Sequence, residues 1–267
     1  MNRKCRFLVL VLSFLLLSGC SLQTLDDLYQ VPKRSDEYND LQEAIDKNLK
    51  GLEFCAPLNG ENLQTIQMAD LDGDSVQECL LFAKGTEEKP LQILIFAMKN
   101  GEYALADTIE SYGTAFDMVQ YARIDDQPGV ELIVGCQISQ DVARSVGVYS
   151  LRDGKAVPLM STNYTRFLSC DLMEDQRSEL MVFHSEEAAE DHGLVQLYWY
   201  SHGKLSIFGQ TNLSGSAERL KRVVLGQLQD GENAVFADIA VDRNSVTTDV
   251  LAVVNGKFTN LADADKQ

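Results

Sequence analysis

The chain has 267 residues and a formal net charge of −17, with 45% hydrophobic and 24% charged residues. This composition is ordinary for a globular protein and allows one large domain or two small ones, so wholesale disorder is excluded. A nucleic-acid-binding protein needs a basic face. The 40 Asp and Glu residues against 23 Lys and Arg residues argue against nucleic acid as a partner.

Residues 1–19 have the pattern of a signal peptide. Basic residues at positions 3, 4 and 6 precede an apolar run over 7–17, which is shorter than the roughly 20 residues that a membrane-spanning helix needs. The run leads into Leu17-Ser18-Gly19-Cys20, which resembles the lipobox of bacterial lipoproteins. The resemblance implies lipidation of Cys20, cleavage before it, and an extracytoplasmic protein held to the bacterial cell membrane by its lipid. The alternatives are an uncleaved anchor or an ordinary secretory signal.

Residues 20–34 have little periodicity and are expected to form a tether. A helix is expected over 35–51, where Ser35 is a suitable N-terminal cap and Gly51 a natural stop. Apolar residues recur at every fourth position in Leu41, Ile45 and Leu49, which predicts one apolar stripe that packs against the domain that follows.

From residue 52 to residue 267 the sequence repeats. Ala69–Glu78 is an acidic stretch followed by an apolar run, and Ala122–Glu131 repeats it 53 residues later. A third copy is Cys170–Glu179, and a fourth, eroded copy ends at Glu232. Repeats at this spacing indicate one supersecondary unit used four times.

A turn marker follows each copy at a constant distance. Gly101, Gly154, Gly203 and Gly256 lie 23, 23, 24 and 24 residues after the glutamates, each preceded by Asn, Asp or His, as in tight hairpin turns. Four strands are therefore expected in each unit, with units near 63–115, 116–163, 164–214 and 217–261. The predicted fold is all-β, a β-propeller-like array of four four-stranded repeats.

The acidic loop between strands, repeated along the chain, resembles the FG-GAP or VCBS repeat, whose members build β-propellers similar to the integrin α-chain N-terminal domain. The resemblance covers roughly residues 63–261. The Phe-Gly and Gly-Ala-Pro signatures are absent, which favours the VCBS-like bacterial branch. Four units could close a ring, with the segment 52–56 as a strand that joins the first and last units. An open arc, or a solenoid-like or sandwich packing, is the alternative.

The first acidic loop is a candidate Ca²⁺ site. Carboxylates occupy loop positions one, three, five and nine, a spacing that suits a hard cation with oxygen ligands, and a backbone carbonyl could add a further oxygen. The resemblance also implies Ca²⁺ here. The alternative is a solvated Asp-rich turn. The proposed ligands are Asp70, Asp72, Asp74, the Val76 carbonyl and Glu78.

The other loops depart from this pattern. In the second loop Arg123 replaces the first ligand and is expected to neutralise the carboxylates without a metal. The third loop has Met173 at position three, so Asp171, Asp175 and Glu179 are weaker metal candidates. Because a glutamate ends all four copies, it is expected to have a structural role, accepting hydrogen bonds from backbone N–H groups in its loop.

No catalytic motif is present: there is no nucleophile elbow, phosphate loop, dinucleotide fingerprint or HExxH sequence. Cys79, Cys136 and Cys170 lie in or beside apolar strands and are expected to be buried free thiols. The alternative is disulfides, which the even number formed with Cys55 would allow outside the cytoplasm. The sequence therefore predicts that the protein is not an enzyme but a non-catalytic binding module for an unknown protein or glycan. The alternative is an enzyme that acts on extracellular polysaccharide or cell wall.

Overall fold

The structure is a computed structural model of the 267-residue chain, and it describes residues 36–138, 144–185, 193–243 and 245–264. Chain contacts divide it into two units, Met1–Asn39 and Asp40–Gln267. The predicted signal peptide, Cys20 and tether lie outside the described residues and stay predictions. No helix of the described part is long and apolar enough to cross a membrane.

In the described ranges one helix precedes the sheets. Helix α3 spans Asp36–Asn48, within the predicted range of 35–51. Its residues Leu41, Ala44, Ile45 and Leu49 pack on one face of the first sheet, in a cluster with Leu81, Phe96 and other buried residues. The predicted apolar stripe is therefore used for packing and covers the outer face of this sheet.

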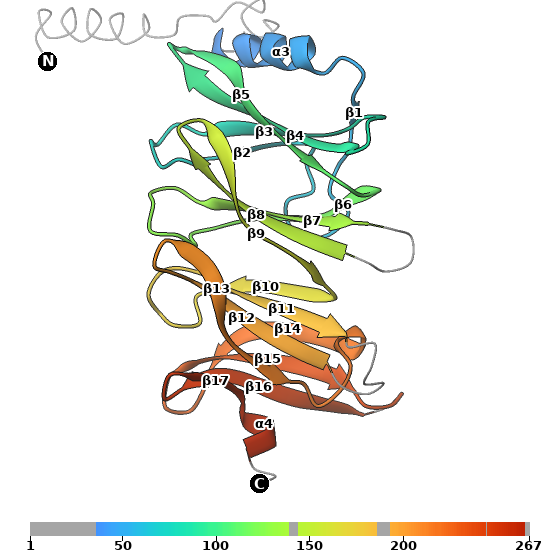
Figure 1. The fold of residues 1–267 in the computed structure, drawn as a ribbon, viewed down its shortest axis with the longest axis vertical. Coiled ribbons are helices and arrows are strands. Elements are labelled where there is room, and N and C mark those ends of the chain that lie inside the picture. The colour runs from blue at the N-terminus through green and yellow to red at the C-terminus, as the bar shows by residue number, and fades with distance from the viewer. Residues whose placement is uncertain (1–35, 139–143, 186–192, 244, 265–267) are drawn as a thin grey trace, which may run out of the picture. The chain divides into compact units, whose positions relative to one another are not determined.

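In the described residues after this helix, nearly all of the regular secondary structure is β-strand, arranged as four antiparallel sheets that follow one another along the chain (Figure 1). The predicted all-β repeat array is confirmed. The first sheet has one extra strand, and the others have four each. The strands of the first sheet are β1 Glu53–Phe54, β2 Ile66–Ala69, β3 Glu78–Lys84, β4 Leu91–Lys99 and β5 Glu102–Ser111. Those of the second are β6 Ala115–Ala122, β7 Glu131–Gln137, β8 Arg144–Arg152 and β9 Lys155–Tyr164.

The third and fourth sheets repeat this order, and a short helical turn stands between them. The third consists of β10 Arg166–Cys170, β11 Glu179–Ser185, β12 Gly193–Ser201 and β13 Lys204–Asn212. The fourth consists of β14 Leu220–Gln227, β15 Asn233–Ala240, β16 Val246–Val254 and β17 Lys257–Asn260. The 3₁₀ turn η1 spans Ala217–Arg219, and α4 spans Leu261–Ala264 after the last strand.

The four hairpin turns have the predicted geometry. In Asn100-Gly101, Asp153-Gly154, His202-Gly203 and Asn255-Gly256 both residues have positive φ, between 50° and 89°. A type I′ turn requires this at both central positions, and its twist matches the twist of the strands that it joins. These turns fix the register between the last two strands of each sheet.

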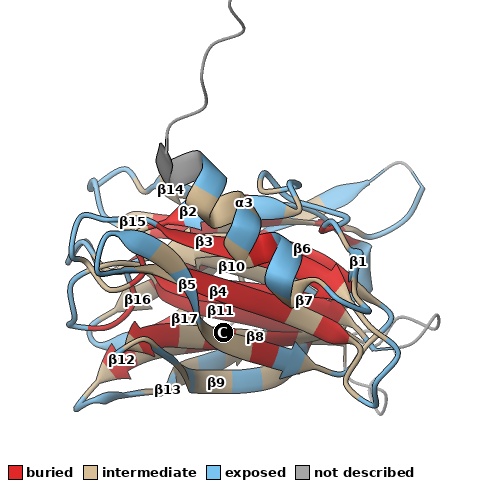
Figure 2. Cartoon of the chain, turned by 90° about the horizontal axis from the view of Figure 1, so that it is seen from above, coloured by how far each residue is buried: buried red, intermediate tan, exposed pale blue. Residues whose placement is uncertain are grey.

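The core lies between successive sheets. Separate buried clusters join the first sheet to the second, the second to the third, and the third to the fourth. Strands β3, β7 and β11 are buried on both faces. The last strands of the first two sheets, β5 and β9, are mostly exposed or half-buried. In Figure 2 the buried residues accordingly gather in the middle strands. Between the first two sheets, Phe82 and Phe116 meet edge to face with ring centroids 5.2 Å apart.

The array does not close through the segment 52–56. Strand β1 pairs with β3 of the first sheet, Glu53 opposite Lys84, so the predicted link from this segment to the last unit is wrong. In the described part of the chain, the buried clusters join only neighbouring sheets. The backbone of β1 forms its hydrogen bonds with β3 and so has none available for a strand of the fourth sheet.

Between β1 and β2 the chain crosses to the second sheet. The backbone N–H of Asn59 donates to the carbonyl of Asp117 on β6, and the Asn59 side chain donates to the Asp117 carboxylate at 2.9 Å. The Tyr164 hydroxyl bonds the other carboxylate oxygen, near the guanidinium of Arg144. This buried carboxylate ties the first two sheets together and is fully engaged in doing so.

We expect Phe116→Ala to lower the free energy of unfolding by about 3–5 kcal/mol, because it removes a fully buried ring between two sheets and leaves a cavity. Urea unfolding measures the change. Phe54→Ala is the control, since Phe54 is 52% exposed, and surface substitutions usually change stability by about 0.5 kcal/mol or less. Equal losses in the two variants would contradict this placement of the core.

Candidate metal site

The first acidic loop runs from β2 to β3 and is closed by the pairing of Ala69 with Glu78. Gly73 and Ser75 adopt positive φ, which turns the backbone tightly. The Asp70 carboxylate accepts hydrogen bonds from the N–H groups of Gly73 and Ser75 at 2.8 and 3.1 Å. Asp72 accepts from the N–H of Asp74 at 3.1 Å. The aspartates thus fold the loop around themselves, as aspartates do in turns.

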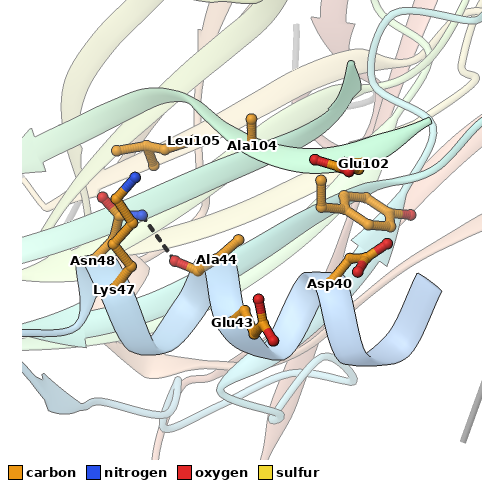
Figure 3. A pocket seen from close by; sticks show the side chains of 9 residues that line it. Asp40, Glu43, Ala44, Lys47, Asn48, Glu102, Ala104 and Leu105 are labelled. Carbon is orange, nitrogen blue, oxygen red and sulfur yellow. Dashed lines mark hydrogen bonds between the residues drawn. The ribbon is translucent and has the colours of Figure 1, made fainter. Parts of the chain in front are cut away.

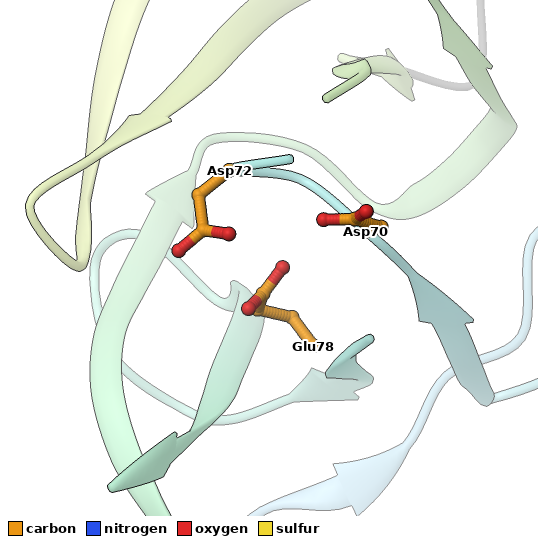
Figure 4. Close-up of side chains that lie close together, drawn as sticks. All are labelled: Asp70, Asp72 and Glu78. Carbon is orange, nitrogen blue, oxygen red and sulfur yellow. The ribbon is translucent and has the colours of Figure 1, made fainter. Parts of the chain in front are cut away.

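Three carboxylates converge in this loop. One oxygen each of Asp70, Asp72 and Glu78 lies within 4.8 Å of the others (Figure 4). Glu78 is 2% exposed and accepts a hydrogen bond from the N–H of Leu71 at 2.8 Å. Burial, together with the charges of Asp72 and Asp74, raises the pKa of Glu78 to about 7. A cation placed here would favour the ionised glutamate, so the cluster can hold a metal ion.

The other two predicted ligands belong to exposed residues. Asp74 is exposed, and its carboxylate accepts a hydrogen bond from the N–H of Val76 at 2.7 Å. Val76 is exposed as well. The structure therefore brings together the carboxylates of Asp70, Asp72 and Glu78, and Asp74 does not belong to this group.

In the second loop an arginine neutralises a loop carboxylate, but this arginine is Arg152 and not the predicted Arg123. Asp125, at loop position three, is buried and pairs with Arg152 from the end of β8, with Nη2 to Oδ2 at 2.9 Å. Ser150 donates to the same oxygen at 3.2 Å. Arg123 is exposed and forms no ion pair within the described ranges. The expectation for Arg123 is therefore wrong, because a residue at the mouth of the loop cannot reach a carboxylate that turns inward.

The third loop also carries its own cation. Arg177 donates to Asp175 from Nε and Nη2, the latter at 2.6 Å, while Asp171 accepts from the N–H groups of Asp175 and Gln176. In the part of the chain that the structure describes, Asp171, Asp175 and Glu179 do not form a converging group like that of the first loop. Arg177 therefore neutralises Asp175, the counterpart of the exposed Asp74 in the first loop.

Three of the four repeated glutamates close their loops in the same way. Glu78, Glu131 and Glu179 each accept a hydrogen bond from the N–H of the residue seven positions earlier, at 2.7 to 2.9 Å. Glu131 and Glu179 accept a second bond from the following N–H. The structural role expected for these three is observed.

The fourth glutamate does not share this role. Glu232 is exposed and precedes β15. Leu180, which follows Glu179, packs toward the second sheet, and Val235 packs toward the third sheet in the same way. The residue before Val235 is the buried Ala234, which therefore takes the position that the glutamate has in the other units. The fourth loop is also shorter than the others, since Gln227 pairs with Asn233.

Each loop is hydrogen-bonded to the next one. The carbonyls of Asp70 and Arg123 accept from the N–H groups of Val130 and Ser178, and the carbonyl of Asp171 accepts from the side chain of Asn233. A Cβ on Gly73 would come within 2.3 Å of Pro128. The loops therefore form a continuous row along one end of the sheets, and a metal in the first loop would stabilise contacts of the second.

Sequence reasoning missed the two arginines. For Arg152 the sequence offered a signal: a basic residue directly precedes the hairpin turn in both of the first two units, Lys99 in the first and Arg152 in the second. Lys99 is exposed and, within the described residues, forms no ion pair. The first loop is thus the acidic loop with no protein cation beside it.

Away from the acidic loops, a hollow of about 560 Å³ lies between α3 and β5 (Figure 3). Asp40, Glu43 and Glu102 line it, with Lys47 as a counter-charge and Leu105 at one side. The amide of Asn48 donates to the carbonyl of Ala44 at 2.8 Å and stays on the helix. The acidic side chains of this hollow have a lysine beside them, and no buried polar group points into it among the described residues. The hollow therefore does not indicate a particular ligand.

No protein-family model and no curated protein matches the chain. Solved structures do match. They include an exotype rhamnogalacturonan lyase, YesX, at 11% identity over 78% of this chain, with a TM-score of 0.38. A rhamnogalacturonan lyase of Bacillus licheniformis matches at 12% identity over 76%, with a TM-score of 0.41, and the rhamnogalacturonan lyase YesW at 14% over 77%, with 0.36. The chain spans about half the length of these proteins, 49%, 47% and 53% respectively.

These matches correct one expectation. The lack of a catalytic motif led to the prediction that the protein is not an enzyme, whereas the solved structures that it matches are lyases. That prediction is withdrawn. At identities of 11–14% and TM-scores of 0.36–0.41, the likeness assigns no lyase activity to this chain either.

We expect the free energy of unfolding in the presence of a chelator to fall as the pH rises from about 5 to 7.5. Burial raises the pKa of Glu179 to about 7, above its value in the unfolded chain, so the folded protein binds more protons across this range and loses stability as they leave. Glu179→Gln should reduce the fall by about 1–3 kcal/mol, measured by urea unfolding at both pH values.

The control for this experiment is Glu232→Gln, which changes an exposed glutamate of the same repeat position in the sequence. It should leave the pH dependence unchanged. A Glu179→Gln variant that loses as much stability as the wild type over this range would contradict the argument.

Proposed function

We propose that the protein is a lipid-anchored extracytoplasmic protein that binds a protein or glycan partner and whose β-sheet array is stabilised by Ca²⁺ in the first acidic loop. The observation that carries the proposal is the difference between the loops. An arginine bonds a loop carboxylate in two loops: Arg152 of β8 in the second and Arg177 in the third. The four carboxylates of the first loop have no such partner among the described residues. The VCBS-like resemblance of the loops supports the same proposal.

Calcium suits the first loop better than a softer metal does. The converging groups are all carboxylate oxygens, and Ca²⁺ binds six to eight oxygens at about 2.3–2.6 Å in flexible geometry. Asp70, Asp72 and Glu78 would supply the inner ligands, with Asp74 and the Val76 carbonyl completing the shell after a small movement of the loop. The ion would neutralise the carboxylates and hold β2 to β3. We do not extend it to Asp171, Asp175 and Glu179, because Arg177 already pairs there.

The anchor rests on the lipobox-like sequence at Cys20. Cleavage before it removes three basic and no acidic residues, which takes the formal charge from −17 to −20. Anionic lipid headgroups repel such a protein, so the acyl chains on Cys20 would be what holds it to the membrane. The protein would then act on the outer side of the bacterial cell membrane, where glycans and surface proteins are its available partners.

Glycan is the partner to test first. It is the ligand class shared by the binding role and by the alternative from the sequence, an enzyme that acts on polysaccharide. The acidic surface disfavours nucleic acid because phosphate groups would be repelled. Binding of the purified protein to polysaccharides from its own cell envelope, followed by analysis for cleaved products, separates the two possibilities.

Calcium should raise the melting temperature of the folded protein, because an ion that binds only the folded state stabilises it by about 2.7 kcal/mol at one hundred times its dissociation constant. Asp72→Asn should abolish most of the shift. Asp126→Asn is the matched control, since Asp126 is an exposed aspartate of the second loop. Thermal scans in EDTA and in Ca²⁺ measure the effect, and an equal shift in both variants would exclude this site.

Lipidation should move the full-length protein into the detergent phase when it is produced in a bacterium and extracted by phase partitioning. Cys20→Ser removes the thiol that forms the thioether, so this variant should stay in the aqueous phase or keep its signal peptide. Mass spectrometry of the mature N-terminus identifies the acylated cysteine. A wild type without a lipid at Cys20 would overturn the anchor.

A further inference from the structure

A cleft of about 290 Å³ opens between the outer parts of the first and second sheets. Its walls come from the end of β5, the start of β8 and the facing part of β9. Clefts that hold small ligands begin at roughly 300 Å³, so this one has room for a ligand of about one ring. It lies apart from the acidic loops, since its lining includes none of their residues.

The cleft exists because small residues stand where the next sheet has large ones. Gly147 pairs with Val134 in the second sheet, and Gln196 pairs with Val182 at the same place in the third. The Gln196 side chain fills that space and bonds His184, Tyr198 and Gln210. At Gly147 the ring of Tyr149 packs against the backbone instead, 2.8 Å from where a Cβ would stand. The same place is therefore covered by an aromatic ring in the second sheet and by the Gln196 side chain in the third.

A second position shows the same exchange. Ser145 pairs with Cys136 in the second sheet, and Leu194 pairs with His184 at the equivalent place in the third. Ser161 on β9 lies opposite Gly147 and also lines the cleft. The two serines therefore replace bulk that would otherwise close the space between the sheets.

The walls offer hydroxyl groups. Ser111 and Tyr149 both line the cleft. No hydrogen-bond partner is found among the described residues for the hydroxyls of Ser145 and Ser161, although both line the cleft. Hydroxyl groups that donate and accept are suited to a ligand that does both.

An aromatic ring stands at the rim. Tyr112 is 53% exposed, its hydroxyl bonds Glu88, and the ammonium of Lys89 lies 5.4 Å from its ring centroid. These two contacts hold the ring in place at little further cost on binding. Lys89 and Glu110 both line the cleft, so its charged groups balance and do not favour an anion.

We propose that this cleft binds one neutral sugar ring of a glycan. Ser145, Ser161 and the other hydroxyl groups of its walls would bond the sugar hydroxyls, and Tyr112 would pack against the C–H groups of the ring. An apolar ligand would leave the serine hydroxyls without partners, and a phosphate would meet Glu110 beside the one lysine of the lining. The inference rests on the proposed binding function and names its ligand class.

The test is ligand-observed NMR of the full-length protein with D-glucose, D-galactose and D-mannose, and with D-glucuronate as the anionic probe. Saturation transfer to at least one neutral hexose is expected. Ser145→Leu places the residue of the third sheet in the cleft and should weaken binding by about tenfold or more. Tyr112→Ala should do the same.

Two control variants should bind like the wild type. Phe54→Ala removes another exposed aromatic ring, and Ser206→Leu changes a serine on the outer strand of the third sheet. Transfer to none of the neutral sugars, transfer to glucuronate alone, or binding that Ser145→Leu leaves unchanged overturns the cleft. The Ca²⁺-dependent melting shift is measured on the same samples, so a retained shift without sugar binding rejects the cleft and leaves the proposed function standing.

Discussion

The array depends on a buried carboxylate at the start of the second strand in each of its first three units. Glu78, Glu131 and Glu179 each bond the backbone N–H seven residues back, and that single contact sets the length and turn of the loop. The carbonyl that opens each of these loops is then free to accept a hydrogen bond from the next loop. Closure within a unit and contact between units are thus linked through the same few residues.

This arrangement has an electrostatic consequence. A buried glutamate needs its lone pairs bonded and its charge balanced, or its proton retained. The second loop has Arg152 beside its buried Asp125, and the third has Arg177 beside Asp175. The first loop keeps three converging carboxylates and has no arginine in this place. A divalent cation there would do for the first unit what a guanidinium does for the other two.

The outer edges of the sheets carry a different kind of variation. Near the start of the third strand, one position that faces the preceding sheet is Gln196 in the third sheet and Gly147, covered by the ring of Tyr149, in the second. Both sheets keep the same register and the same hairpin turn. A repeated scaffold can therefore vary the space between two units without a change in its loops.

The sequence by itself determined the unit, its number and its strands. Asp-Gly and Asn-Gly turns at constant spacing, and apolar runs after each acidic loop, are local signals that a strand and a hairpin need in order to form. The spacing placed Asp70, Asp72 and Glu78 among the candidate ligands of the first loop, and the structure brings these three together but not Asp74. Only the tertiary structure decided that Arg152 pairs with Asp125, that Glu232 lies outside its expected position, and that β1 joins the first sheet. These depend on which side of a strand a residue faces and on contacts between chain segments that the spacing of one segment does not contain.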